Sequence, residues 1–331
     1  MRGICIDLGS GNTSISALVK GNVFTQPSVV TIDTDDNIIT DAGSISKEAI
    51  GKTPEHLMTV KPLNGGVIAD YSAAEGMVKL LVKKAFNRSV FTGVNALVTT
   101  PSDATQMEKR AAAETVKNLG VSTVNTIECS MAAAIGAGVN VMTPTGSMVV
   151  DIGAGVADAS VIALGTIATG SCVKVAGDAM DAAIVAYVKR KYSILIGENT
   201  AERMKIELGC AVPKEKNELK KYKGRDIASG LPKEFAVYSE EIRVVISDIL
   251  KKIIDSVVIT LEKTPPELLS DVIESGIILT GGCSQIYGIE ELFTKKTGFK
   301  TTVAQDPAMC TLRGAEKVFL DKKLRKLVKK N

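Results

Sequence analysis

The chain has 331 residues, of which 45% are hydrophobic and only 4% aromatic, and it contains no tryptophan. This length suits two lobes better than one core. The formal charge of +3 gives no support to nucleic-acid binding, and a single histidine with no CxxC pair argues against a structural zinc site.

In the first half, the pattern predicts a strand at 2–7, the turn Gly9-Ser10-Gly11-Asn12 and a second strand at 13–19. The elements expected next are a strand at 28–32, helices around 46–50 and 72–86, a strand at 95–101, a helix at 103–119 and an Ala/Gly-rich helix at 129–139. We expect Ser102 to cap the helix at 103–119 and Gly120 to end it.

The opening pattern returns in the second half. Asp7-Leu8-Gly9-Ser10-Gly11 and Asp151-Ile152-Gly153-Ala154-Gly155 each lie between two predicted strands, and a repeat at about half the chain length indicates duplicated lobes. The apolar region 147–170 carries Asp151 and Asp158, so it predicts two strands and no membrane span, and we expect a cytoplasmic protein. The later elements expected are helices over 178–209, an exposed Lys/Glu-rich excursion at 211–234, an amphipathic helix at 240–262, and a strand, Gly-Gly turn and helix start at 275–285.

The two glycine turns point to phosphate binding. Because each turn lies between two strands, the strand-to-helix fingerprint of dinucleotide-binding folds does not apply, and no Walker A motif is present. Glycine lets backbone N–H groups approach phosphate oxygens closely, and Asp7 and Asp151 are placed to hold hydrated Mg²⁺. One such turn alone would more often be an ordinary tight turn, but the pair, with Gly281-Gly282 after a third strand, predicts that ATP and Mg²⁺ bind in a cleft.

These segments resemble the actin/Hsp70 ATPase superfamily, and specifically the bacterial actin MreB family. The resemblance runs through nearly the whole chain and is carried by IDLGSGNTSI (6–15), QPSVVTI (26–32), KPLNGGVIADYSAAEGMVK (61–79), TPSDATQMEKRA (100–111), MAAAIGAGVNVMTPTGSMVVDIGAG (131–155), YSILIGENTAERMKIELG (192–209), PPELLSDVIESGIILTGG (265–282) and AQDPAMCTLRGAEK (304–317). It implies an α/β, actin-like ATPase fold, in which two duplicated RNase H-like lobes enclose a nucleotide cleft. The implied subdomains are IA at 1–25, 69–140 and 310–331, IB at 26–68, IIA at 141–176 and 244–309, and IIB at 177–243.

The resemblance also implies the residues of the nucleotide site. The first phosphate loop is Ser10, Gly11 and Asn12, the second is Gly153, Ala154, Gly155 and Val156, and the loop beside the adenosine is Gly281, Gly282, Cys283 and Ser284. Glu202 and Lys205 match the pair that holds the ribose and adenine. They lie one helical turn apart, so a plain surface ion pair is the alternative. Asp7, Asp151 and Asp178 match acidic positions near the metal, with Mg²⁺ held mostly through water.

Two departures from the family concern catalysis. The family places a water-orienting Glu where this chain has Cys129, and a Thr in the second phosphate loop where this chain has Val156, while Asp151 is kept. Orienting the nucleophile is a central task in phosphoryl transfer, and such groups contribute about 10²–10⁴-fold. Glu128 faces elsewhere and is a poor substitute. We therefore expect a weak ATPase at most, unless another polar group holds the water.

Two segments bear on membranes. The family often carries an N-terminal amphipathic helix, which we do not expect here. Residues 322–330, KKLRKLVKK, place Leu324, Leu327 and Val328 at helical spacing among basic residues. This pattern predicts either an amphipathic segment that binds anionic membrane surfaces at the inner face or a solvated tail. Val90-Phe91 occupies the position of an apolar membrane-contacting pair in the family, or packs on the core.

The resemblance implies a filament-forming cytoskeletal protein with ATP in each subunit. Its partners would be copies of itself in protofilaments and other MreB-like actins, and its role would be in cell shape. The changes at Cys129 and Val156 resemble the paralogues of wall-less, helical, swimming bacteria, which links it to motility. The alternatives are an Hsp70-like ATPase, which would carry a substrate-binding domain that we do not expect, and a plasmid-segregation ATPase, whose sequence fits less well. A sugar or acetate kinase would need a catalytic Asp motif that does not appear.

Overall fold

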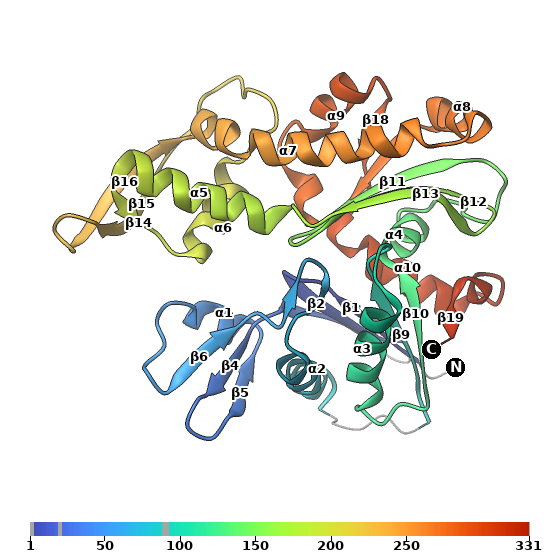
Figure 1. Ribbon diagram of the computed structural model, residues 1–331, viewed down its shortest axis with the longest axis horizontal. Helices are drawn as coiled ribbons and strands as arrows, with labels where there is room; N and C mark the ends of the chain where they lie inside the picture. The colour runs from blue at the N-terminus through green and yellow to red at the C-terminus, as the bar shows by residue number, and fades with distance from the viewer. Residues whose placement is uncertain (1–2, 19–21, 88–92, 331) are drawn as a thin grey trace.

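The computed structural model describes residues 3–18, 22–87 and 93–330, and it consists of two lobes, each built on one large sheet (Figure 1). The sheet of the first lobe has the order β19-β10-β9-β1-β2-β3, and that of the second lobe β13-β12-β11-β17-β18. The bounds in the first lobe are β1 Gly3–Leu8, β2 Asn12–Ala17, β3 Asn22–Pro27, β9 Asn95–Thr100, β10 Thr123–Glu128 and β19 Lys329–Lys330. Those in the second lobe are β11 Ser147–Ile152, β12 Ala157–Ala163, β13 Thr166–Val173, β17 Ile277–Thr280 and β18 Thr301–Val303.

The two sheets repeat one topology. Strands β1 and β2 form an antiparallel hairpin, as do β11 and β12. The first strand of each hairpin also pairs in parallel with a later strand, β1 with β9 and β11 with β17. A third strand continues each hairpin, β3 in one lobe and β13 in the other. The prediction of two duplicated α/β lobes is therefore confirmed.

Each lobe carries an insertion with a small sheet of its own. In the first lobe it comprises β4 Val30–Asp33, β5 Ile38–Ala42, α1 Ser44–Ala49 and β6 Leu57–Val60, followed by the short hairpin β7 Leu63–Asn64 and β8 Val67–Ile68. In the second lobe it comprises α5 Gly177–Tyr192, β14 Ile194–Leu195, α6 Glu198–Leu208, β15 Leu219–Asp226 and β16 Pro232–Tyr238. The exact division into four subdomains stays a prediction.

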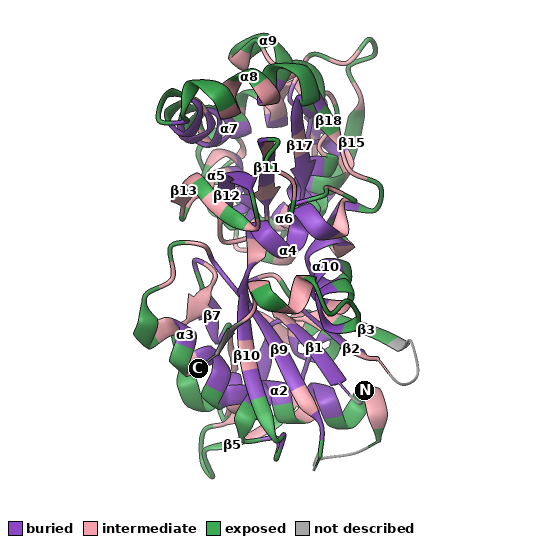
Figure 2. Ribbon diagram, turned by 90° about the vertical axis from the view of Figure 1, so that its right-hand side faces the viewer, coloured by how far each residue is buried: buried purple, intermediate pink, exposed green. Residues whose placement is uncertain are grey.

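Helices cover both faces of the sheets. The remaining helices are α2 Tyr71–Phe86, α3 Gln106–Lys117, α4 Cys129–Gly136, α7 Ser239–Glu262, α8 Pro266–Ser275, α9 Ile289–Thr297 and α10 Cys310–Leu320, with short 3₁₀ turns at Gly282–Gln285, Pro307–Met309 and Leu324–Leu327. Alternation along β1 points Ile4 and Ile6 toward α2 and α3, and Cys5 toward α4 and α10. The α4–α10 cluster also takes in Val149 and Ile162 of the second lobe, so this pair of helices joins the lobes (Figure 2).

The expectation that Ser102 caps the helix at 103–119 was wrong. The helix expected from residue 103 begins at Gln106, and its N-cap is Thr105, which forms a capping box with Glu108. Ser102 instead donates its backbone N–H to Asp158. The region 211–234 is exposed at most positions, as expected, and it also contains β15 and the start of β16, with Tyr222 of β15 buried in the core.

The basic tail, predicted to be either an amphipathic segment or a solvated tail, forms a turn whose apolar side chains pack on the protein. Residues Leu324–Leu327 form a 3₁₀ turn, and Lys329–Lys330 pair with β10. Leu324, Leu327 and Val328 pack against the α4–α10 cluster, so these side chains do not form a free apolar face for a bilayer. The pair Val90-Phe91 lies outside the described residues. No helix in the described part of the chain is both long and apolar enough to cross a bilayer.

Candidate nucleotide site

The two glycine turns have the same backbone geometry and meet between the lobes. In the first turn Gly9 N–H donates to the Asn12 carbonyl at 3.1 Å, and in the second Gly153 N–H donates to the Val156 carbonyl at 2.9 Å. A Cβ on Gly11 would lie 2.7 Å from the Cβ of Ala154. A Cβ on Gly155 would lie 2.6 Å from Oγ of Ser10. Only glycine at these two positions lets the turns approach so closely.

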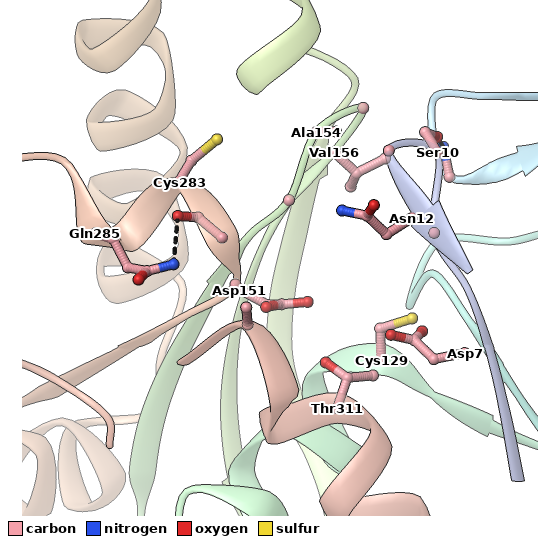
Figure 3. A pocket seen from close by; sticks show the side chains of 18 of the residues that line it. Asp7, Ser10, Asn12, Cys129, Asp151, Ala154, Val156, Cys283, Gln285 and Thr311 are labelled. Atoms are coloured by element: carbon pink, nitrogen blue, oxygen red, sulfur yellow. Dashed lines mark hydrogen bonds between the residues drawn. The ribbon is translucent and has the colours of Figure 1, made fainter. Parts of the chain in front are cut away.

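A cavity of about 550 Å³ lies between the lobes beside these turns, and Figure 3 shows it from close by. It brings together nearly all of the residues predicted for the site. These are Asp7, Ser10, Gly11, Asn12, Cys129, Asp151, Gly153, Ala154, Gly155, Val156, Glu202, Lys205, Gly281, Gly282 and Cys283. Two predicted residues do not line it. Ser284 is buried and donates its hydroxyl to the Gly281 carbonyl at 2.7 Å, which shapes the loop, and Asp178 lines a neighbouring cavity of about 290 Å³.

Three aspartates lie on the wall of the larger cavity: Asp7, Asp151 and Asp158. Thr99 donates its hydroxyl to Asp7 at 2.5 Å, and Thr280 donates to Asp151 at 3.0 Å. Burial raises the pKa of Asp7 and raises that of Asp151 to about 7, with the charge of Asp7 as the second cause. A cation between these groups would relieve both effects.

The sequence prediction missed Asp158 as a site residue. It lies directly opposite Asp151 in the register of β11 and β12, and it accepts hydrogen bonds from Ser102 N–H at 3.0 Å and from the Ser160 hydroxyl at 3.1 Å. Burial raises its pKa. The available signal was a charged residue near the start of a largely apolar strand.

The donor set fits a hydrated Mg²⁺ ion better than a directly coordinated one. Within the described ranges, no three or more Asp, Glu, Cys or His side chains converge closely enough to bind a metal ion directly. The carboxylates of Asp7, Asp151 and Asp158 all line the same cavity wall, however. Mg²⁺ usually keeps several of its waters and takes further ligands from phosphates, so this arrangement suits it.

Cys129 and Val156, the two departures from the family pattern, both face the cavity. Cys129 is the first residue of α4, and burial together with the charges of Asp7 and Asp151 raises its pKa, so its thiol stays neutral. Val156 supplies no hydroxyl. Glu128 does not line the cavity but is buried beside Lys109, whose Nζ lies 3.2 Å from its carboxylate. The expectation that Glu128 faces elsewhere is confirmed. Thr311, which was not predicted, places its side chain at the cavity wall (Figure 3).

Another wall of the cavity is formed by α6 and the loop that follows β17. Lys205 is buried and donates to Asp181 at 2.8 Å and to the Gly177 carbonyl at 3.0 Å. Glu202 pairs instead with Lys47 of α1 at 2.5 Å. The alternative of a Glu202–Lys205 surface ion pair was therefore wrong, since each has a different closest partner.

Six more residues in or after these two segments line the cavity and were not predicted. They are Ile206, Gly209, Lys214, Gln285, Ile286 and Tyr287. Lys214 Nζ lies 5.5 Å from the centroid of the Tyr287 ring. Gln285 and Tyr287 follow directly on the predicted loop Gly281–Ser284, so continuing that loop by three residues was the signal available in the sequence.

The duplicated lobes, the paired glycine turns and the cavity between them define a protein of the actin-like fold class. The description of the family model that matches residues 1–327 is "MreB/Mbl protein". This chain belongs to the MreB/Mbl family.

Individual relatives agree with this assignment. The chain is 40% identical over 319 residues to the cell shape-determining protein MreB of Escherichia coli (strain K12), with 95% of this chain and 92% of the relative covered. It is 38% identical over 313 residues to the cell shape-determining protein Mbl of Bacillus cereus, covering 95% and 94%.

Solved structures agree as well. MreB5 of Spiroplasma citri bound to AMPPNP superposes with a TM-score of 0.92 at 34% identity, covering 98% of this chain and 97% of that one. A chain of the MamK double helical filament gives a TM-score of 0.80 at 20% identity, with 97% and 99% covered, and supports the fold alone. The predicted actin-like fold is confirmed, and neither the Hsp70-like nor the plasmid-segregation alternative is favoured.

Proposed function

We propose that this protein binds ATP between its lobes and polymerises into cytoskeletal filaments that contribute to cell shape. One observation carries the nucleotide assignment: two glycine turns, one from each lobe, meet beside a 550 Å³ cavity that Glu202 and Lys205 also line. The S. citri MreB5 structures hold AMPPNP and ADP. The cell-shape role is supported by relatives described as cell shape-determining proteins.

Asp7, Asp151 and Asp158 would hold Mg²⁺ through its water ligands, and the ion would neutralise charge on the β- and γ-phosphates. The backbone N–H groups of the two turns would bind the same phosphates. The proposed division of labour is that backbone groups grip the phosphates while the carboxylates hold the hydrated ion.

Hydrolysis of the bound ATP is proposed to be slow. Neither the neutral thiol of Cys129 nor the methyl groups of Val156 can accept a proton from water or orient it, and Glu128 is held by Lys109. The site would then act as a switch that holds nucleotide, with other MreB-like actins as partners and a contribution to motility.

The basic tail is proposed to contact anionic membrane surfaces through charge alone. Its apolar side chains pack on the core, whereas Lys322, Lys323 and Lys326 remain exposed. Such attraction falls off within a Debye length. Sedimentation with phosphatidylglycerol vesicles should therefore succeed at low salt and fail at high salt, and binding that persists at high salt would contradict this mode.

Electron microscopy with ATP, with ADP and with AMPPNP tests the filament proposal. We expect filaments with ATP and with AMPPNP, and calorimetry should show ATP binding at micromolar affinity or tighter, about −8 kcal/mol or more favourable. Absence of filaments under all three conditions would contradict the cytoskeletal role. Absence of ATP binding would contradict the assignment of the cavity.

A further inference from the structure

Two ion pairs and a hydrogen bond join the insertions of the two lobes. Lys47 Nζ, on α1 of the first lobe, lies 2.5 Å from the Glu202 carboxylate on α6 of the second lobe. Lys61 Nζ lies 2.6 Å from the Glu198 carboxylate at the start of α6. The Asn199 side-chain amide donates to the Lys47 carbonyl at 2.7 Å. Figure 1 shows α1 and α6 facing each other from the two lobes.

The charges on the two sides are complementary beyond these pairs. The facing surface of the second lobe also carries Asp178 and Asp181, and all four acidic side chains line the 290 Å³ cavity together with Lys47 and Lys61. Burial opposes the charged form of Lys61, but its hydrogen bond to Glu198 and the charges of Glu198, Asp178 and Asp181 raise its pKa. Lysines of the first lobe therefore meet an acidic surface on the second.

This charged contact adjoins both glycine turns. Ser10, Gly11 and Ala154 line the 290 Å³ cavity as well as the 550 Å³ cavity, so the small cavity lies between the turns and the contact. The two insertions cannot move apart, and expose this side of the turns, without separating Lys47 from Glu202 and Lys61 from Glu198.

Glu202 connects the contact with the nucleotide site, because it lines both cavities while it pairs with Lys47. We propose that Lys47 is a positioning residue, which holds the Glu202 carboxylate toward the ribose of a bound nucleotide. We further propose that the Lys47–Glu202 and Lys61–Glu198 pairs form a latch that must open before the nucleotide leaves. Both statements rest on the proposed nucleotide-binding function.

The outer pair tests the latch without touching the nucleotide site. Lys61 and Glu198 do not line the 550 Å³ cavity, and their side chains are 42% and 59% exposed, so the pair is weak. Lys61→Met is expected to raise the dissociation rate of etheno-ATP, chased with excess ATP, by about 3-fold. Glu198→Gln should have a similar effect. The double variant should be no faster than Lys61→Met alone, because both changes remove one interaction.

A matched control is Lys79→Met, which breaks the exposed Lys79–Glu75 pair within α2 and should leave the rate unchanged. The latch is overturned if the rates of Lys61→Met and Glu198→Gln match the parent, or if their effects multiply in the double variant. If the unaltered protein binds no etheno-ATP or ATP, the proposed function itself fails, which is a separate outcome.

The inner pair tests the positioning role through selectivity. If Lys47 orients Glu202 toward the ribose, Lys47→Met should reduce the preference for ATP over 2′-deoxy-ATP by about 3- to 10-fold, since a hydrogen bond to a charged group discriminates by about this much. Lys47→Arg should retain the preference. Lys61→Met should weaken the two nucleotides equally. An unchanged preference in Lys47→Met would overturn the positioning role, even if both nucleotides dissociate faster.

Discussion

The two glycine turns share a backbone but differ in side-chain chemistry. In the first turn, the Ser10 hydroxyl accepts the Gly66 N–H at 2.9 Å, and Ser28 donates to the Gly9 carbonyl at 2.6 Å. The second turn is fixed by backbone groups instead, with the N–H of Asp178 donating to the Ala154 carbonyl at 2.8 Å. The proposed grip on phosphate relies on what the turns share, namely backbone N–H groups, so it should not require the same side chains in both turns.

The aspartates beside the two turns have equivalent hydrogen-bond partners, whereas the turns themselves do not. Asp7 accepts a hydrogen bond from Thr99 on β9, and Asp151 accepts one from Thr280 on β17, the parallel neighbour in each lobe. The hydrogen bonds to these two aspartates are therefore equivalent in the two lobes. The lobes differ at Asp158, because Ser14 holds the matching position opposite Asp7, and at the groups proposed to handle water, Val156 and Cys129.

The largest effect is expected from restoring those groups. Cys129→Glu combined with Val156→Thr should raise the rate of phosphate release by about 100-fold, the lower part of the range for a positioned acid–base group. The new carboxylate would join Asp7, Asp151 and Asp158, so the rate should be measured by a phosphate-release assay at saturating Mg²⁺.

The control for that variant is Cys129→Gln with Val156→Thr, which has nearly the same size but no carboxylate. It should bind ATP as the parent does and hydrolyse it much more slowly than the glutamate variant. If the glutamate variant is no faster than the parent, the account of the two departures is wrong.

The next largest effect concerns the contact between the turns. A Cβ added in Gly11→Ala would lie 2.7 Å from the Ala154 Cβ. Overpacking of this kind costs about 1–3 kcal/mol, so we expect the affinity for ATP to fall by about 10- to 100-fold by calorimetry.

The compensating change is Ala154→Gly, which removes the atom that Gly11→Ala would strike. The double variant should recover most of the affinity, whereas Gly197→Ala, whose Cβ would meet nothing within 4 Å, should change little. Failure of Ala154→Gly to rescue would show that the turns do not meet as described.

A smaller effect is expected from removing magnesium. Because Asp7, Asp151 and Asp158 face the same cavity, EDTA should weaken ATP binding by about 10-fold, and Asp158→Asn should reduce the dependence on Mg²⁺ by part of that amount. Asp271→Asn, in α8 and away from the cavity, is the control and should keep the full dependence. Mg²⁺-independent binding by the parent would contradict the assigned role of the carboxylates.

The sequence was enough to predict the lobes and most of the site because a repeat encodes them. Asp7-x-Gly-x-Gly and Asp151-x-Gly-x-Gly carry the turn, the strand ends and the acidic groups together. Asp158 was missed as a site residue because it has no motif of its own. Its role follows from its register opposite Asp151, which depends on how the hairpin closes.

Other features depend on tertiary contacts that no local pattern contains. The Lys47–Glu202 pair requires both insertions to be placed relative to each other. The spacing of Leu324, Leu327 and Val328 is as compatible with a turn packed on α4 and α10 as with a membrane-binding helix. By contrast, the capping box of Thr105 and Glu108 could have been predicted, because these residues match the local pattern S/T-x-x-E. The prediction chose Ser102 as the cap instead.

The smallest effect is expected from exchanging the side chains by which the two turns differ, at positions 10 and 154. Ser10→Ala makes the first turn resemble the second, because alanine occupies the matching position 154, and it leaves the Gly66 N–H without the Ser10 hydroxyl. A neutral hydrogen bond contributes about 0.5–1.5 kcal/mol, so the affinity for ATP should fall by about 3- to 10-fold.

The converse change, Ala154→Ser, adds a hydroxyl to a turn that is already fixed by backbone hydrogen bonds, and it should leave the affinity almost unchanged. The two substitutions exchange the same pair of residue types at equivalent positions, so their difference measures what the side chain contributes in each lobe. Equal losses from both would mean that the hydroxyl at position 10 has no special role.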